Sequence, residues 1–239
     1  MSTRQTLTLG NERFYVGPWH ADSAIAYLTI KSNQVEPTAR GLHACLDQLR
    51  QDGYSSVITT ALHPLEARPY FDAGFLEYDR LRVLSHDLRR VGMMGNSKPA
   101  GVQLRRAKRA DRSLALAVDK LAFPRFWRLD ASGLDEAISA TPRTRFRLAE
   151  LQGAPVGYSV VGKSRHQGFL QRLATHPDYA GTGVGSALVV DALLWARSRK
   201  VSRVLVNTQT DNQRALRLYK QLGFQLTPTD LVVLTKDLP

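Results

Sequence analysis

The chain has 239 residues, 43% of them hydrophobic and 23% charged, which suits a globular protein with a sizeable core and leaves room for one large domain or two small ones. A single cysteine, Cys45, excludes an intramolecular disulfide, and the sequence holds no Cys/His pattern with metal-ligand spacing. We therefore expect a cytoplasmic protein that uses no metal.

The apolar segments argue against a membrane partner. The first ten residues are polar, unlike a secretory signal. The most apolar stretch, 187–196, contains Asp191 and is far too short to span a bilayer. We expect the chain to be soluble.

Basic residues are concentrated in the second half. Lys and Arg exceed Asp and Glu by 12; residues 1–100 hold 11 basic and 10 acidic side chains, whereas residues 101–239 hold 22 and 11. Such a surface favours a polyanion, which can be a nucleotide cofactor with several phosphates, an acidic protein or RNA. A run such as 105–112 equally suits a solvated surface without a partner.

The first half contains a helix and a strand that can be predicted directly. Within 41–50, four apolar residues recur at helical spacing, and a β-branched strand surrounds Val57. Between 89 and 101, three glycines and a proline interrupt any apolar period, as in a linker. We place a domain boundary there, between domains at 1–88 and 102–239.

The second half alternates strands and helices. We predict strands at 102–106, 143–151, 155–162, 168–175, 203–209 and 230–236, and helices at 109–123, from the glycine-rich segment 181–185 to about 200, and at 213–222. This order predicts an α/β (α+β) fold with a mixed, mostly antiparallel central sheet flanked by helices.

The first half repeats part of this pattern. Tyr70, followed by Gly74 and Phe75, matches Tyr219, followed by Gly223 and Phe224, at an offset of 149 residues. The strands around Val57 and Val206 match at the same offset, which indicates an internal duplication. The alternative is coincidence, since a helix that ends in Gly before an aromatic strand residue is common.

The segment from Pro177 to Gly185 joins a predicted strand to a predicted helix and has glycines at 181, 183 and 185. Glycines let the backbone bring consecutive amides toward one point, and amides at a helix N-terminus form an anion nest suited to a pyrophosphate. The spacing is neither that of a P-loop nor that of a dinucleotide fingerprint. A turn that only caps the helix is the alternative.

Two motifs carry a family resemblance. The pattern Thr175-x-Pro177-x-x-Ala180-Gly181-x-Gly183-Val184-Gly185-x-x-Leu188 resembles the acetyl-CoA pyrophosphate motif of the GNAT acyltransferase superfamily, and Asn212-x-x-Ala215-x-x-x-Tyr219-x-x-x-Gly223-Phe224 resembles its second conserved segment. The resemblance covers roughly residues 101–239. Ala180 stands where Arg or Gln is usual, which removes one phosphate contact but leaves the backbone amides in place.

The resemblance implies an N-acetyltransferase with acetyl-CoA as cosubstrate, in which an acceptor amine attacks the thioester directly within a ternary complex. It implies a cofactor cleft between two splayed parallel strands, 168–175 and 203–209, with amides near Leu173 and Thr175 along the pantetheine arm. The cofactor-binding residues it implies are Leu173, Ala174, Thr175, Ala180, Gly181, Thr182, Gly183, Val184, Gly185, Ser186, Asn212 and Tyr219.

Tyr219 is the expected general acid, because a phenol is protonated at neutral pH and can give its proton to the departing thiolate. It also lies on a helical apolar stripe, where a tyrosine can be part of the core. Asn212 either positions the cofactor or caps the next helix, as Asp211 also can. Glu150 is the candidate base; His176, water, or a merely structural Glu150 are alternatives.

The acceptor is an unspecified amine of a small molecule or a protein. The segment 123–130 borders the acceptor site in this family; its aromatic rings either line that site or pack in a core, and Asp130, Asp135 or Glu136 can attract a cation. By the 149-residue offset Gly183 falls on Gln34, so the first half resembles a degenerate repeat without a cofactor site. This tandem organisation resembles that of mycothiol synthase, although no residue carries that substrate over.

Two other functions fit the sequence. A non-catalytic acyl-CoA-binding sensor would bind the cofactor without transferring its acyl group. A basic protein associated with RNA or the ribosome would bind phosphate backbones through the second half. No recognisable nucleic-acid module occurs, so a nucleic acid is the least favoured partner.

Overall fold

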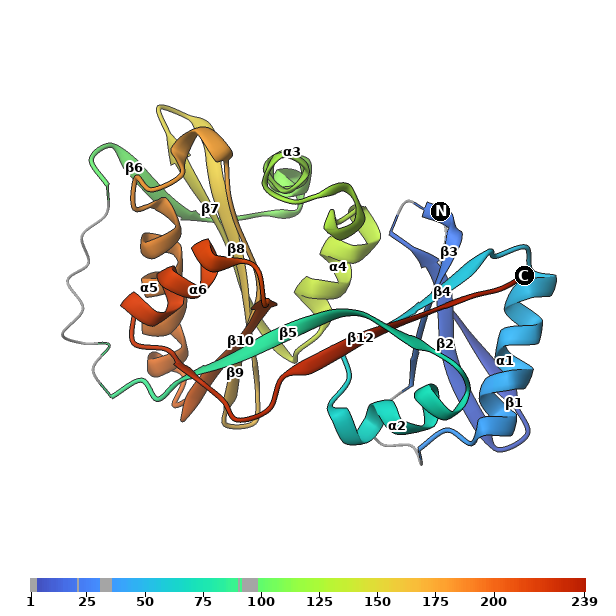
Figure 1. Cartoon of the computed structure of the whole chain (residues 1–239). Helices are drawn as coiled ribbons and strands as arrows, with labels where there is room; N and C mark the ends of the chain where they lie inside the picture. The colour runs from blue at the N-terminus through green and yellow to red at the C-terminus, as the bar shows by residue number, and fades with distance from the viewer. Residues whose placement is uncertain (1–3, 21, 31–35, 90, 92–98) are drawn as a thin grey trace. The chain divides into compact units, whose positions relative to one another are not determined.

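The computed structural model describes residues 4–20, 22–30, 36–89, 91 and 99–239. The chain divides into two compact units (Figure 1). Unit 1 comprises Met1–Val83, Gln209–Asp211 and Thr227–Pro239, and unit 2 comprises Leu84–Thr208 and Asn212–Leu226. The division therefore differs from a single linear boundary, because the C-terminal strand belongs to the first unit. Most of the predicted linker at 89–101 lies outside the described residues.

Unit 1 is a sheet with two helices. Its strands, in sheet order, are β1 (Gln5–Leu9), β2 (Glu12–Trp19), β3 (Asp22–Ile30), β4 (Ser56–Thr59), β12 (Leu231–Asp237) and β5 (Leu76–His86), and its helices are α1 (Ala39–Gln51) and α2 (Pro64–Asp72). Only β3 and β4 pair in parallel; β12 pairs antiparallel with both β4 and β5. The last three residues of β5 belong to unit 2.

Unit 2 has the sheet order β10-β9-β8-β7-β6. The strands are β6 (Val102–Arg106), β7 (Arg143–Leu151), β8 (Ala154–Ser164), β9 (Gln167–Thr175) and β10 (Arg203–Gln209), and the helices are α3 (Arg112–Ala122), α4 (Ala131–Ser139), α5 (Val184–Ser198) and α6 (Gln213–Gln221). Every neighbouring pair is antiparallel except β9 with β10. The short strand β11 (Gln225–Leu226) pairs with the end of β5.

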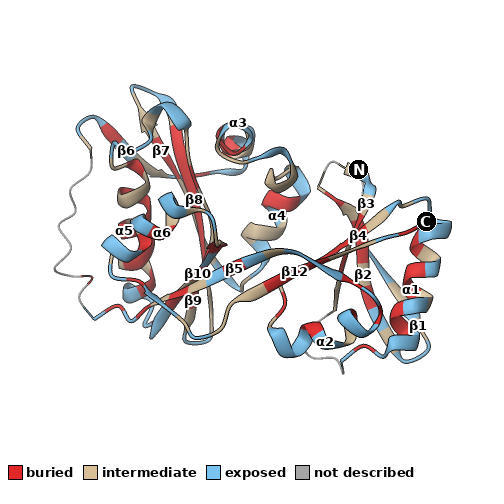
Figure 2. Cartoon of the chain, viewed as in Figure 1, coloured by how far each residue is buried: buried red, intermediate tan, exposed pale blue. Residues whose placement is uncertain are grey.

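Helices cover both faces of the second sheet. Helices α5 and α6 lie on one face and α3 and α4 on the other (Figure 1). Leu188 of α5 packs beside Val156 of β8, whereas Tyr158, two residues further along β8, packs with α3 and α4. Buried residues follow α1 and α5 on the sides turned to their sheets (Figure 2). The mixed, mostly antiparallel fold expected from the sequence is confirmed.

The structure also contains elements that we did not predict. Strands β1 to β3 were missed, although Gly10 and Asn11 between two alternating segments are a two-residue hairpin signal. Helix α4 was missed too; its signal was Asp130, whose carboxylate caps Gly133 N at 2.7 Å ahead of the helically spaced Leu134 and Ile138. Both signals are short and local, which makes them easy to overlook.

The predicted internal repeat is present. In each unit, three antiparallel strands are followed by a helix, a strand parallel to the third, and a second helix. Helices α2 and α6 have the same length and lie 149 positions apart, which is the offset of the tyrosine pattern. Each tyrosine is buried and packs on the aromatic residue that follows its glycine.

Candidate functional site

The glycine loop ends in an uncapped helix N-terminus. Gly181 and Gly183 have φ values of +79° and +91°, which disfavour a side chain, and Gly183 is the N-cap residue of α5 without any side-chain cap. The first amides of a helix have no intrahelical acceptor. The Thr182 hydroxyl donates to the carbonyl of Tyr179 at 2.7 Å and closes the preceding turn. The loop therefore presents free amide donors at the positive end of a helix dipole.

The parallel strands next to this loop pair only at their beginnings. The register of β9 with β10 covers Gln167 to Phe169 against Arg203 to Leu205, and β9 then continues for six residues. The amide of His176 donates to the carbonyl of Val156 on β8 at 2.9 Å. Because successive amides along a strand alternate in direction, those of Thr175 and Leu173 point to the opposite edge, toward the unpaired side.

Ala174 lies between these two residues and turns the other way. Its side chain is buried in the cluster beneath α3 and α4, and its carbonyl lies toward Gly157 of β8. Gly185 closes the same corner from α5, since a Cβ there would lie 3.3 Å from Thr175 Oγ1 and 3.4 Å from Leu218. The end of β9, the start of α5 and helix α6 therefore converge.

A β-bulge lies where the parallel pairing stops. Val160 of β8 pairs with Arg172, and the adjacent Val161 pairs with Leu170, so Gln171 is the extra residue. Its side-chain Oε1 is buried without a hydrogen-bond partner. The bulge re-aims the side chains of β9 next to the site, and no sequence signal indicated it.

Tyr219 is buried on α6 against Phe224, with ring centroids 5.5 Å apart. Burial raises the pKa of its phenol well above the ordinary value, and the guanidinium of Arg172 opposes that shift. The phenol therefore stays protonated at neutral pH, as a proton donor must. Tyr219 is also part of the core cluster of α5 and α6, which is the alternative predicted for it.

A buried ion pair that sequence reasoning missed joins β9 to the 123–130 segment. Asp119 of α3 is completely buried and accepts two hydrogen bonds from Arg172, at 2.8 and 2.9 Å. It also accepts from Leu129 N at 2.8 Å and from the Tyr158 hydroxyl. Arg172 donates in addition to the carbonyl of Trp127 at 2.7 Å.

The same guanidinium stacks over Phe123, 3.4 Å from the ring centroid. One fully satisfied charge pair thus fastens the aromatic segment to the strand beside the cleft. Of the carboxylates predicted to attract a cation, Asp130 caps α4 and Asp135 pairs with Arg112 at 2.9 Å.

A comparison with protein families matches residues 115–224 to the acetyltransferase (GNAT) family. The match includes the glycine loop, the splayed strands and Tyr219. The chain contains a GNAT acetyltransferase domain. Apart from Gln209–Asp211, the matched residues all belong to unit 2, and the match spans somewhat less than the predicted 101–239.

Two relatives of the GNAT domain are mycothiol acetyltransferases. The protein from Acidothermus cellulolyticus is 33% identical over 91 residues, which is 36% of this chain and 28% of the relative. The protein from Saccharomonospora viridis is 28% identical over 185 residues, 71% of this chain and 60% of the relative. The matched part of the chain therefore spans less than two thirds of either relative.

Solved structures extend the likeness to both units at the level of the fold. A tandem GNAT protein from the clavulanic acid biosynthesis pathway superposes with a TM-score of 0.67 at 15% identity, over 97% of this chain and 81% of that one. A GCN5-related N-acetyltransferase from Kribbella flavida gives a TM-score of 0.62 at 17% identity, over 98% and 90%. The fold is therefore that of a tandem GNAT protein.

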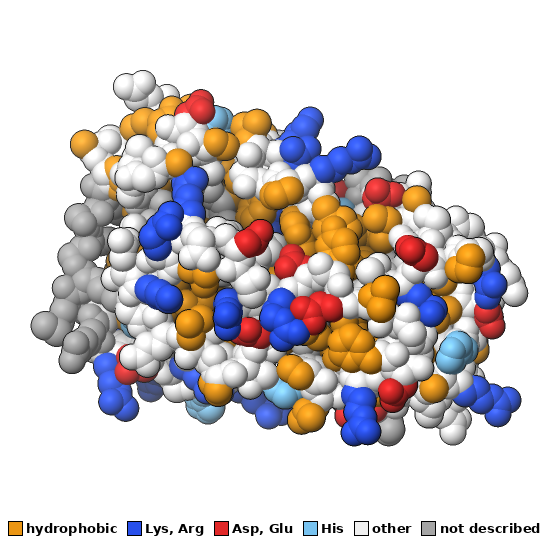
Figure 3. All heavy atoms as spheres, viewed as in Figure 1, with side chains coloured by type: hydrophobic (Ala, Val, Ile, Leu, Met, Phe, Trp, Pro, Cys, Tyr) orange, Lys and Arg blue, Asp and Glu red, His pale blue; other side chains and the backbone are white. Residues whose placement is uncertain are grey.

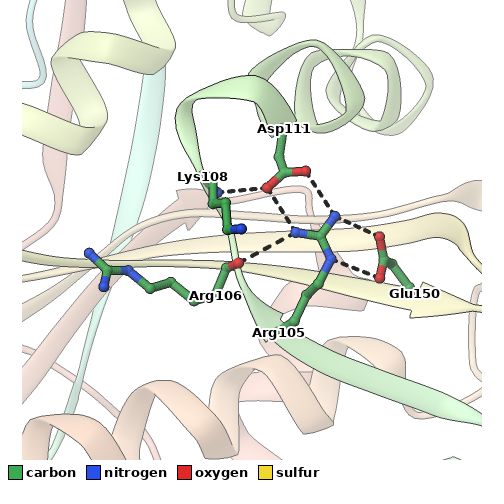
Figure 4. A network of polar contacts seen from close by, with 5 residues as sticks. All are labelled: Arg105, Arg106, Lys108, Asp111 and Glu150. Carbon is green, nitrogen blue, oxygen red and sulfur yellow. Dashed lines mark hydrogen bonds and ion pairs between the residues drawn. The ribbon is translucent and has the colours of Figure 1, made fainter.

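Glu150, the predicted base, is engaged in an ion-pair network (Figure 4). Both of its oxygens accept from Arg105, at 2.7 and 2.8 Å, and Arg105 also binds both oxygens of Asp111 at 2.8 Å. Arg105 and the amide of Lys108 lower the pKa of Asp111 to about 2. The network ties β6 and β7 to the turn before α3.

The two remaining predicted polar residues both cap helices. Asn212 is the N-cap residue of α6, where its Oδ1 accepts from Ala215 N at 3.1 Å, so the capping alternative is confirmed. The His176 ring accepts from Asp178 N at 3.3 Å and packs on Tyr179. Neither contact excludes a second partner for the side chain.

Among the described residues, no helix is long and apolar enough to cross a bilayer, and no group of three His, Cys, Asp or Glu side chains is arranged to hold a metal ion. The loop, in contrast, fits a diphosphate. Gly181 and Gly183 hold the left-handed turn; a Cβ would meet no atom within 4 Å at Gly181 and would lie 3.2 Å from Pro99 at Gly183, and the helix N-terminus supplies the amide donors. The residues present therefore suit the phosphates of acetyl-CoA.

Proposed function

We propose that the chain is an acetyl-CoA-dependent N-acetyltransferase that moves an acetyl group to a primary amine by direct attack in a ternary complex. The observation that carries this proposal is the joint position of the uncapped α5 N-terminus and the unpaired edge of β9 within the GNAT domain. Acetyl-CoA, when bound, supplies an acetyl group activated as a thioester.

In this proposal the backbone does most of the binding. The amides from Gly181 to Ser186 hold the diphosphate, and the outward amides of Leu173 and Thr175 hold the pantetheine arm. Ala180 contributes its backbone alone, and Asn212 keeps α6 in place beside the cleft. Orientation of the two reactants supplies much of the acceleration, because it converts a bimolecular step into one within a complex.

Tyr219 supplies the proton that the leaving sulfur takes. Its raised pKa keeps the phenolic proton in place across the physiological range, and its position on α6 is set by core packing rather than by a flexible loop. Glu150 stays the candidate base. In the structure Glu150 makes a bidentate contact with Arg105, so Glu150→Gln separates a catalytic role from a structural one. If Glu150 is the base, the substitution changes the pH profile of kcat. If its role is structural, the substitution changes stability alone.

The first experiment is a calorimetric titration of acetyl-CoA into the wild type, Gly183→Val and Gly153→Val. Gly153 lies in the turn between β7 and β8 with φ +80° and open space around its Cβ position, so it reproduces the backbone strain away from the loop. We expect saturable binding in the wild type and the control and at least 100-fold weaker binding in Gly183→Val. Equal binding by both variants would contradict the proposed cofactor site.

A screen of amine acceptors follows. The names of the two relatives make mycothiol precursors one class to include, beside amino sugars, polyamines and peptide N-termini. Saturable acetyl-CoA binding with no transfer to any amine would favour the alternative function, a non-catalytic acyl-CoA sensor.

A further inference from the structure

Seven cationic side chains gather at one end of unit 2. The end consists of the start of β7, the β8–β9 turn, the C-terminus of α5 and the start of β10, and we call it the basic end. Its cations are Arg143, Lys163, Arg165, Arg197, Arg199, Lys200 and Arg203. Blue side chains project at the lower left of the view in Figure 3, where α5 ends and β8 turns into β9 in Figure 1.

Strand pairing and hydrogen bonds bring these four segments together. Arg143 pairs with Lys163 across β7 and β8, and Lys163 Nζ donates to the carbonyl of Arg199. Both the amide and the hydroxyl of Ser202 donate to the carbonyl of His166, at 2.8 and 2.9 Å. The cluster is therefore built by the fold from segments up to sixty positions apart.

Elsewhere unit 2 mixes cations paired with carboxylates and unpaired ones such as Arg106, Arg109 and Lys120, whereas every cation of the basic end is unpaired within the described chain. The paired ones are Arg105, Arg112, Arg145, Arg147 and Arg172. None of the seven cations at the basic end forms an ion pair with a carboxylate of the described chain, and the segments 163–167 and 197–203 contain no Asp or Glu. Uncompensated charge of one sign attracts a polyanion.

The composition of the surface indicates which polyanion fits. Apart from the buried Val201, the residues between the cations are Ser, His and Gln, and Ser and Gln side chains contact phosphate oxygens. None of the large hydrophobic side chains exposed in the described chain lies here, so an acidic protein would find no apolar anchor. Single strands need exposed aromatic rings for stacking, and these segments hold no Phe, Tyr or Trp.

We propose that the basic end binds the phosphate backbone of a double-stranded nucleic acid. Five of the seven cations are arginines, whose planar guanidinium matches phosphate oxygens in pairs. The basic end is at the C-terminus of α5, and the glycine loop is at its N-terminus, about 22 Å away along a helix of 15 residues. The basic end is therefore distinct from the proposed cofactor site, and this proposal does not depend on acetyl transfer.

The test measures fluorescence anisotropy of a labelled 20-base-pair RNA duplex and of a DNA duplex, between 50 and 200 mM salt. The test variant is Arg143→Gln/Arg197→Gln/Arg199→Gln, whose side chains are exposed and make no hydrogen bond or ion pair within the described chain. The matched control is Arg106→Gln/Arg109→Gln/Lys120→Gln, which removes the same charge from exposed positions elsewhere in unit 2.

With about five phosphate contacts, the wild-type affinity should fall about 500-fold over that salt range, and the test variant should lose about three of the contacts, which lowers the salt slope by about 2.7. The control should keep the wild-type slope. Equal salt slopes in the two variants would overturn the proposal, because binding would then depend on net charge and not on where the cations lie. Tighter binding of single strands than of duplexes would also overturn it. Circular dichroism and thermal unfolding of both variants verify that they are folded, and the RNA and DNA arms show which duplex is preferred.

Discussion

The helix that follows the three antiparallel strands of the repeat begins differently in the two units. In unit 2, α5 begins at Gly183 without a side-chain cap. In unit 1, the N-cap of α1 is Thr38, whose hydroxyl accepts from Gly41 N at 3.0 Å. The carboxylate of Glu12 accepts from the amide and the hydroxyl of Thr38, at 2.6 and 3.0 Å, and lies where a Cβ of Gly41 would be.

Unit 1 therefore satisfies its helix N-terminus with the chain's own anion. A carboxylate at that end is stabilising for the same reason that a phosphate would be. The equivalent of Gly183 by the sequence offset, Gln34, lies outside the described residues. A repeat can therefore keep its fold while one of its own carboxylates takes the place of a bound anion at the helix N-terminus.

The parallel strands of the two units also differ in how far along the earlier strand their pairing extends. In unit 1 the pairing of β3 with β4 reaches Leu28 and Thr59, and Thr60 N still donates to the carbonyl of Leu28 at 3.1 Å. In unit 2 the pairing stops six residues before β9 ends. The parallel pair therefore stays together almost to the end of β3 in unit 1, whereas in unit 2 the last six residues of β9 are unpaired on the side of β10.

The largest effect should come from removing residues 227–239, because this deletion takes β12 out of unit 1 and leaves unit 2 as the only folded repeat. Strand β12 pairs with β4 and β5, and Val232, Leu234 and Leu238 belong to the core of that unit. We expect unit 1 to lose protection from hydrogen exchange while unit 2 keeps its own. A truncated chain whose unit 1 amides stay protected would contradict the assignment of β12 to that core.

Asp119→Asn should be the next most severe change, because Asp119 is completely buried in its pair with Arg172, whereas no carboxylate in the described part of unit 1 is buried. The substitution leaves the Arg172 charge buried without its partner, which costs about 3–5 kcal/mol of unfolding free energy. Urea unfolding measures the loss; a loss below about 1 kcal/mol would mean that water compensates the guanidinium.

Tyr219→Phe and Tyr70→Phe form a matched pair at equivalent positions of the two repeats. Both tyrosines are buried and pack on a phenylalanine. Loss of the Tyr219 hydroxyl should lower kcat by about 100-fold or more, since it removes a general acid. Tyr70→Phe should leave kcat unchanged. Steady-state transfer assays check both, and equal kcat values would remove Tyr219 from the chemistry.

Glu12→Gln sharpens the comparison of the helix N-termini. It removes the charge at α1 while a carboxamide oxygen can still accept from Thr38. We expect a loss of about 1 kcal/mol in the unfolding free energy of unit 1 and no change in acetyl-CoA affinity. Thermal unfolding with and without acetyl-CoA separates the two quantities, and a weakened affinity would show that α1 takes part in cofactor binding.

Acidification should destabilise unit 2 gradually. His86 is buried beside Phe224 and accepts from Leu88 N at 2.9 Å, and burial lowers its pKa. Because the unfolded chain then binds the proton more readily, stability is lost as pH falls below about 6.5, by at most about 1.4 kcal/mol per pH unit. His86→Gln should flatten the slope between pH 7 and 5, whereas the exposed control His43→Gln should keep it.

Local patterns determined much of unit 2. The glycine loop, the strands 143–151 and 203–209 and helix α6 match their predicted positions closely, because hydrophobic period, glycine and cap signals act over a few residues. Tyr219 and Asn212 followed from the spacing of one motif on one helix.

The tertiary structure alone decided the contacts that determine what those motifs can do. Glu12 and Thr38 are 26 positions apart, Arg105 and Glu150 are 45 apart, and Arg172 and Asp119 are 53 apart. The same holds for the register at which β9 leaves β10 and for the return of β12 to unit 1. The physical reason is that ion pairs and strand registers depend on distance in space, which a sequence period of two or four residues does not encode.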